Sequence, residues 1–125
     1  YKYNQSRLTI IEIGGNDALR GMDLDKTYGN IESIIHTARQ NKSKIILVSV
    51  ELPNNYGQAY NEEFAKIYTQ LSEKYGLIQV HLNYPNDQSL VQEDRIHPSE
   101  KGHELIAETL LVPIEKLICS YEKGR

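Results

Sequence analysis

Two short and widely separated motifs contain residue types that could perform acyl transfer. Asn16 follows two glycines, directly after the apolar run of residues 8–13. An asparagine amide on a glycine turn at the end of a strand can donate a hydrogen bond to a developing oxyanion. In the second motif, Asp94 precedes His97 by three residues, a spacing at which a carboxylate can orient an imidazole as a general base.

The nucleophile that such a site needs is not recognisable among the serines. Ser49 lies in a predicted buried strand, and Ser99 is expected to be the N-cap of the last helix. Ser89, in the loop before Asp94, is the least unfavourable candidate, but none of the serines stands on a turn flanked by glycines. We therefore expect the nucleophile to lie on upstream sequence and the chain by itself to be inactive.

Hydrophobic patterns predict the elements that position these motifs. Apolar, β-branched runs predict buried parallel strands at residues 8–13, 45–50 and 77–82. Periodic apolar residues predict helices at 26–40, 60–75 and 99–118. Gly76 is expected to end the second helix, and Pro113 to kink or split the third. This alternation predicts a doubly wound α/β sheet.

The candidate residues are expected to meet at one edge of that sheet. Ligands of open α/β sheets bind beyond the carboxyl ends of the strands. Asn16 follows the first predicted strand and Asn54 the second, while the loop after the third leads to Asp94 and His97.

Three segments of the chain resemble the SGNH (GDSL-type) hydrolases, in particular their bacterial arylesterase, thioesterase I and lysophospholipase branch. The segments are 11–21, 52–57 and 94–98, in the order and at the spacing of the family. The resemblance implies a three-layer α/β/α, flavodoxin-like fold with a parallel sheet. Residues 1–125 would form the C-terminal part of a single domain whose N-terminal strands are missing. The family's Gly-Asp-Ser block is not in the sequence, and Arg95 stands where close relatives often have Gly.

The resemblance implies a serine esterase, lipase or thioesterase that hydrolyses acyl esters, thioesters or lysophospholipids through an acyl-enzyme. His97 would be the general base and acid, Asp94 its orienting carboxylate, and Asn16 an oxyanion donor. The residues that contact substrate would be Gly15, Leu19, Met22, Asn54 and Tyr56. Residues 18–22 are expected to form a mobile loop with Gly21 as a possible hinge.

Two other functions stay open. The chain could be a catalytically inactive remnant that acts as a binding or assembly module. A flavodoxin-like ligand-binding domain ranks below the serine hydrolase and the inactive remnant, because no glycine-rich phosphate loop opens a helix.

Composition excludes several classes of partner. The 14 Lys and Arg against 17 Asp and Glu give a net charge of −3, which disfavours nucleic acid. No apolar run reaches the roughly 20 residues of a membrane-spanning helix. No cofactor is expected, and Asp94, His97 and His103 fit no standard zinc spacing. The only cysteine, Cys119, is expected to be a buried thiol. The family resemblance implies a periplasmic or secreted protein.

The missing strands would leave an open sheet edge. In the family's sheet, the strand of the serine block lies beside the strand predicted at residues 8–13, so Ile10, Ile11 and Ile13 are expected to be uncovered. An exposed apolar edge recruits another strand. We expect either a bound upstream fragment or a strand-paired dimer.

Overall fold

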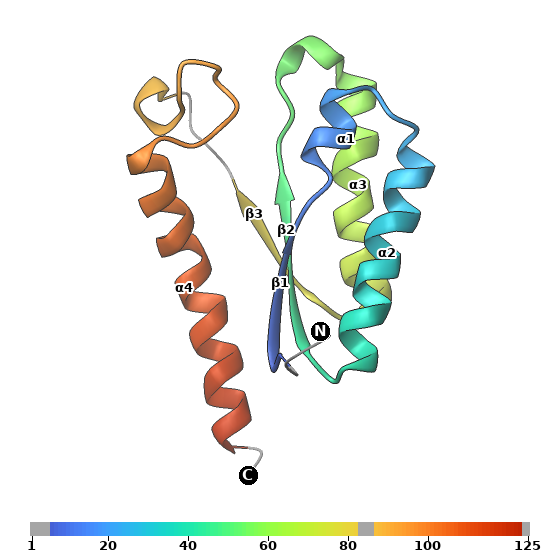
Figure 1. Cartoon of the computed structure of the whole chain (residues 1–125), viewed down its shortest axis with the longest axis vertical. Coiled ribbons are helices and arrows are strands. Elements are labelled where there is room, and N and C mark those ends of the chain that lie inside the picture. Colours follow the sequence, from blue (N-terminus) through green and yellow to red (C-terminus); the bar gives the residue numbers. More distant parts are fainter. Residues whose placement is uncertain (1–5, 83–86, 124–125) are drawn as a thin grey trace. The chain divides into compact units, whose positions relative to one another are not determined.

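The structure, a computed structural model, describes residues 6–82 and 87–123. The chain divides into two compact units, Tyr1–His81 and Leu82–Arg125. Along the first unit run β1 (Leu8–Glu12), α1 (Gly15–Leu19), α2 (Leu24–Gln40), β2 (Lys44–Val50), the 3₁₀ turn η1 (Asn54–Tyr56), α3 (Gln58–Tyr75) and β3 (Ile78–Leu82), whose last residue lies beyond the division (Figure 1). The second unit contains the 3₁₀ turn η2 (Gln88–Leu90) and α4 (Glu100–Lys123).

The three strands form one sheet in the order β1-β2-β3. β1 and β2 are parallel, with Leu8 opposite Lys44 and Glu12 opposite Val48. Residues 45–49 of β2, the central strand of the sheet, are all buried. Each strand lies within one residue of its predicted limits, and the α/β class predicted from the sequence is confirmed.

α2 and α3 cover the same face of the sheet (Figure 1). Alternate strand residues point to this face, where they pack against apolar residues of the two helices. The buried cluster contains Ile11, Ala18, Ile31, Ile35, Ala38, Ile45, Leu47, Phe64, Ile67, Tyr68 and Leu71. Fully burying one Ile, Leu or Phe side chain contributes about 1.5–3 kcal/mol, so this cluster is the main stabilising feature of the first unit.

Local residue types explain where these helices begin and end. Asp23 caps α2, because its side chain accepts a hydrogen bond from the backbone nitrogen of Asp25 at 3.0 Å. Gly76 ends α3 in the left-handed region, at φ 63°. Ser99 caps α4 as predicted, because the Gly102 nitrogen donates to its Oγ at 3.2 Å.

α4 ends five residues beyond its predicted limit of residue 118, and it differs from its prediction in two other respects. The helix continues through Pro113, so the expectation that proline would split it is wrong. Proline removes only one backbone N–H donor, and the other turns of α4 keep their hydrogen bonds. Cys119 is exposed, so the predicted buried thiol is also wrong. It follows Ile118, which is itself 50% exposed, on the solvent side of the helix.

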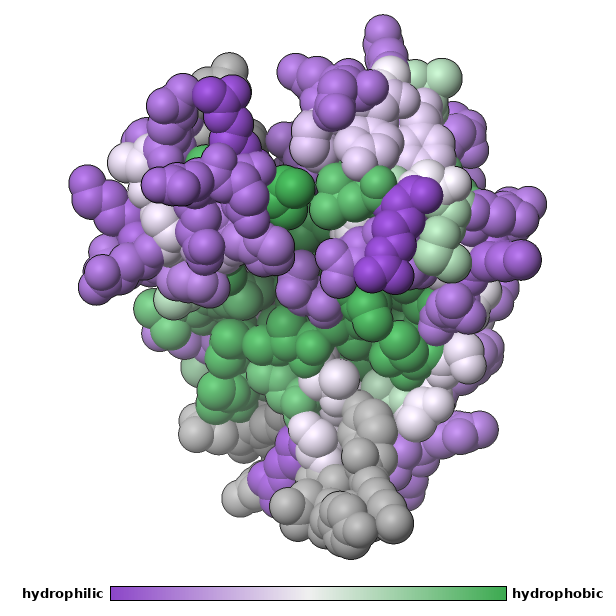
Figure 2. Space-filling view, turned by 45° about the horizontal axis from the view of Figure 1, so that its top comes forward, coloured by the Kyte–Doolittle hydropathy of each residue, from purple (hydrophilic) through white to green (hydrophobic). Residues whose placement is uncertain are grey.

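Large apolar side chains lie open to solvent in both units, and Figure 2 shows apolar surface among polar side chains. On β1, Ile10 is 41% exposed, and Ile13 just after it is 48% exposed. Both agree with the expected uncovered edge. Ile11 is only 4% exposed, which contradicts that expectation, because its side chain points to the face covered by α2 and α3. No helix in the described ranges is both long and apolar enough to cross a membrane.

Candidate active site

The end of β1 is hydrogen-bonded to α3, and the glycine next to this bond has no room for a side chain. The Tyr68 hydroxyl donates to the carbonyl oxygen of Ile13 at 2.6 Å. Burial raises the pKa of Tyr68, so this phenol stays a donor. Gly14 has φ 108°, and a Cβ on it would lie 2.6 Å from the Tyr68 Oη. The residue before Asn16's turn therefore has to be glycine.

Asn16 lies in the first turn of α1, just beyond the carboxyl end of β1, and is exposed. The predicted bare glycine turn is therefore a short helix. The Ala18 nitrogen donates to the Gly14 oxygen at 3.1 Å, and the Arg20 nitrogen donates to the Asn16 oxygen at 3.1 Å. A helix of five residues is too short to show a periodic pattern, and glycine, asparagine and aspartate are typical turn residues.

Two tyrosines hold the segment that follows. The Tyr56 hydroxyl donates to the Leu19 oxygen at 2.6 Å. The Tyr60 hydroxyl lies 3.2 Å from the carbonyl oxygens of both Ala18 and Met22. Ala18 is completely buried within α1, so the prediction of a loop beginning at this residue is wrong.

The five predicted substrate-binding residues all belong to the first unit, and they are Gly15, Leu19, Met22, Asn54 and Tyr56. The hydrogen bond from the Tyr56 hydroxyl to the Leu19 oxygen joins η1 to the end of α1, so these two segments are neighbours. Met22 is 38% exposed, whereas Leu19 is partly buried. Asn54 lies exposed at the start of η1.

In the second unit, Asp94 and His97 form the predicted pair. His97 Nδ1 lies 2.5 Å from Asp94 Oδ2. The other carboxylate oxygen accepts hydrogen bonds from the backbone nitrogens of Ile96 and His97, at 2.9 and 3.0 Å. The His97 hydrogen bond and these two amides lower the pKa of Asp94 to about 2. The side chain of His97 is 66% exposed, so its ring is held at one nitrogen and open to solvent.

Backbone contacts fix the loop that carries this pair. An isolated antiparallel bridge joins Val91 to Pro98, and the Gln92 nitrogen donates to the His97 oxygen at 2.8 Å. The loop also packs tightly against the start of α4. A Cβ on Gly102 would lie 2.1 Å from the Leu90 oxygen, so only glycine fits at that helix position.

Arg95, between the two members of the pair, has φ 59°. Residues with a Cβ rarely adopt this left-handed conformation, and glycine adopts it freely. This geometry explains physically why glycine suits the position at which the chain departs from the family pattern.

The serines of this unit have local structural roles. The Ser89 Oγ and backbone nitrogen both donate to Asp87 Oδ1, at 2.6 and 2.9 Å, and these bonds lower the pKa of Asp87. The Ser99 Oγ donates to the Ser89 oxygen while it caps α4. Sequence reasoning missed a different cluster, in which Ser49 is hydrogen-bonded to His81. A polar residue in an otherwise apolar strand was the available signal.

Comparisons with known proteins identify a family and several relatives of this chain. A family model described as GDSL-like Lipase/Acylhydrolase matches residues 1–110. Thioesterase 1/protease 1/lysophospholipase L1 of Escherichia coli K12 is 29% identical over 124 residues, which cover 94% of this chain. Esterase TesA of Pseudomonas aeruginosa is 33% identical over 114 residues, which cover 89% of the chain.

Solved structures give the same result. The crystal structure of TesA has a TM-score of 0.87 at 29% identity and covers 93% of this chain and 66% of that one. The psychrotrophic esterase EstA from Pseudoalteromonas, inhibited by monoethylphosphonate, has a TM-score of 0.83 at 28% identity, covering 94% and 65%. The chain spans 58% and 57% of the lengths of the two curated relatives. With a family model that matches most of its length, the chain belongs to the GDSL-like lipase/acylhydrolase, or SGNH hydrolase, family.

Proposed function

We propose that this chain is the C-terminal part of a single-domain serine hydrolase that cleaves carboxylic esters or thioesters. The observation that carries the proposal is the hydrogen bond between His97 Nδ1 and Asp94 Oδ2. A carboxylate only accepts hydrogen bonds, so Nδ1 carries the proton and Nε2 keeps its lone pair. The exposed ring then presents a base whose tautomer is fixed.

In the proposed reaction, His97 Nε2 removes the proton of a serine hydroxyl as its oxygen attacks the acyl carbon. The same nitrogen then gives that proton to the departing alcohol or thiol, leaving an acyl-serine ester. A water molecule, deprotonated by the same base, hydrolyses the ester. Asp94, whose pKa of about 2 keeps it ionised near neutral pH, stabilises the imidazolium in both steps.

Asn16 would donate its amide to the oxyanion that forms on the acyl carbonyl. Its exposed place at the carboxyl end of β1 supports this role, because ligands of open α/β sheets bind at that end. Gly15 would allow the substrate to approach the backbone. Leu19, Met22, Asn54 and Tyr56 would contact the acyl chain. Acyl esters, acyl thioesters and lysophospholipids are the proposed substrates, in line with the names of the relatives.

The nucleophilic serine is proposed to lie on sequence upstream of Tyr1. Two facts support this: the 125 residues contain no Gly-Asp-Ser sequence, and they span 58% of the Escherichia coli relative. Reading the parent gene upstream of Tyr1 tests the proposal directly. A parent sequence without a Gly-Asp-Ser block would favour the inactive binding or assembly module instead.

Kinetics of the full parent protein with p-nitrophenyl esters test the roles of the residues. His97→Ala should lower kcat by about 10⁴-fold or more, and Asp94→Asn by up to about 10⁴-fold through the wrong tautomer. Asn16→Ala should lower kcat by about 100- to 1,000-fold. His103→Ala is the matched control, since His103 is an exposed histidine on α4, and it should leave kcat unchanged. An Asn16→Ala variant that changed only KM would exclude the oxyanion role.

The open edge of β1 supports one further part of the proposal. β2 is the only partner of β1 among the described strands, and Ile10 and Ile13 are each more than 40% exposed. The edge is proposed to pair with the upstream segment of the same protein or with β1 of a second copy. Sedimentation and intact-mass measurement of the purified chain distinguish the two. A folded, monodisperse monomer without a companion peptide would contradict both.

A further inference from the structure

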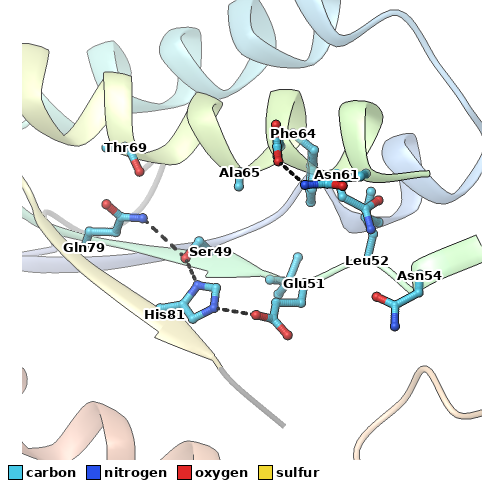
Figure 3. Close-up of a pocket in the computed structure, with 13 residues that line it drawn as sticks. Ser49, Glu51, Leu52, Asn54, Asn61, Phe64, Ala65, Thr69, Gln79 and His81 are labelled. Carbon is cyan, nitrogen blue, oxygen red and sulfur yellow. Dashed lines mark hydrogen bonds and ion pairs between the residues drawn. The ribbon is translucent and has the colours of Figure 1, made fainter. Parts of the chain in front are cut away.

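A second group of reactive side chains lies in the first unit, whereas Asp94 and His97 belong to the second. Ser49 Oγ is 2.9 Å from His81 Nδ1, and His81 Nε2 is 3.0 Å from Glu51 Oε1 (Figure 3). The Gln79 side-chain nitrogen lies 3.4 Å from the same Ser49 Oγ. All four residues line a cavity of about 700 Å³, whose other wall is formed by α3 residues that include Asn61, Ala65 and Thr69.

Strand geometry explains why these residues meet. Ile45 and Leu47 of β2 point into the core, and alternate residues of a strand share a face, so Ser49 continues the face that packs against α3. Glu51 follows Ser49 by two residues, and His81 follows Gln79 by two on the neighbouring strand. Apolar packing on this face thus gives way to a nucleophile, a base and a carboxylate at the carboxyl ends of two adjacent strands.

The hydrogen bonds set the direction of proton transfer. The Glu51 carboxylate can only accept, so the neutral His81 ring carries its proton on Nε2. Nδ1 is then the acceptor, and the Ser49 hydroxyl donates to it. The competing acceptor, the Val80 carbonyl oxygen, is farther away at 3.5 Å. Nucleophile-to-base and base-to-carboxylate distances of 2.9 and 3.0 Å both lie within the range of activated serines.

We propose that Ser49 is an activated serine, deprotonated by His81 and supported by Glu51, which accepts an acyl or phosphoryl group from a small electrophile in this cavity. The roles of the two ring nitrogens are exchanged relative to His97, because Nδ1 of His81 faces the serine and Nε2 faces the carboxylate. Gln79, which already donates to the oxygen of Ser49, is the nearest side-chain donor for the oxyanion that forms. This inference does not rest on the proposed function of His97.

The acylation step balances without any further reactant. The Ser49 oxygen bonds to the carbonyl carbon of an activated ester while its proton moves to His81 Nδ1. The bond to the leaving alcohol then breaks, and that oxygen takes the proton from Nδ1. With diisopropyl fluorophosphate, the serine oxygen bonds to phosphorus, fluoride leaves, and the proton passes through His81 to solvent.

Labelling of the purified chain with diisopropyl fluorophosphate, followed by peptide mass spectrometry, tests the proposal. One equivalent of adduct is expected on the peptide that contains Ser49. Ser49→Ala should remove that adduct, and His81→Ala should slow its formation by about 100-fold or more. Ser33→Ala is the matched control, because Ser33 is an exposed serine on α2 outside the cavity, and it should label like the parent chain.

Circular dichroism of each variant is measured first, so that labelling rates are compared only between folded proteins. An unlabelled Ser49 in the folded chain would overturn the proposal, and so would adducts confined to Ser89 or Ser99. Equal labelling rates with and without the His81 ring would also overturn it, because the serine would then react without its base.

Discussion

Replacing Gly14 with alanine probes the junction that places Asn16 at the end of β1. The added Cβ would lie 2.6 Å from the Tyr68 hydroxyl oxygen and 3.3 Å from Ile31 Cδ1. The first distance is far below van der Waals contact, so the phenol has to move away from the Ile13 carbonyl that it now meets at 2.6 Å. Alanine would also have to adopt a φ of 108°.

Two contributions give the expected size of the effect. A positive φ costs a residue with a Cβ about 1–2 kcal/mol. Leaving the Ile13 carbonyl and the buried phenol without each other costs about 1–3 kcal/mol more. Gly14→Ala should therefore lower the free energy of unfolding by roughly 2–5 kcal/mol, a large part of the total stability of a small domain.

A double-mutant cycle separates the two contributions. In Tyr68→Phe the hydroxyl oxygen is absent, so Gly14→Ala should cost only the backbone part, about 1–2 kcal/mol. Urea unfolding followed by circular dichroism measures all four proteins. Gly29→Ala in the middle of α2 is the matched control, since nothing lies within 4 Å of its added Cβ. It should raise stability by about 0.5–1 kcal/mol.

The cycle has a clear refuting result. Equal costs of Gly14→Ala with and without the Tyr68 hydroxyl would show that this phenol does not constrain the glycine. The fastening of β1 to α3, and with it our account of how Asn16 is positioned, would then be wrong.

Three further predictions concern the second unit. Gly102→Ala should lower the melting temperature measured by calorimetry, because its Cβ would lie 2.1 Å from the Leu90 oxygen and overpacking typically costs about 1–3 kcal/mol. Arg95→Gly should raise the free energy of unfolding in urea by roughly 0.5–1 kcal/mol, since a φ of 59° costs arginine more than glycine's extra chain entropy does. The folded pKa of Asp94, about 2, lies below its ordinary value of 3.8, so ionised Asp94 stabilises the loop above about pH 4 and this stabilisation disappears as the pH falls through 2. The amide NMR signal of His97 should shift over that acidic range, and a midpoint near 3.8 would contradict the lowered pKa.

Features that depend on neighbours in the sequence could be predicted. The strands follow from unbroken runs of apolar, β-branched residues, and α3 ends at Gly76 because only glycine adopts that conformation without strain. The pairing of Asp94 with His97 spans three residues, so one loop is enough to form it.

Features that depend on contacts between distant segments could not be predicted. Tyr56 reaches Leu19 across 37 residues, and Ser49 reaches His81 across 32. Both contacts require the arrangement of neighbouring elements, which no local pattern encodes. α1 escaped prediction for another reason, since its five residues combine turn-forming types with too little length for a helical period.

The phenols of Tyr56 and Tyr60 have a consequence for how this part of the molecule responds to change. Because they hold the carbonyls of Ala18, Leu19 and Met22 from η1 and from the first turns of α3, the segment cannot open without breaking those bonds. The hydrogen-exchange rates of the amides of residues 18–22 should therefore change in parallel with those at the start of α3. In laboratory evolution, substitutions along α3 that contact no ligand would therefore also change the surface around Met22, because residues 18–22 and the start of α3 would move together.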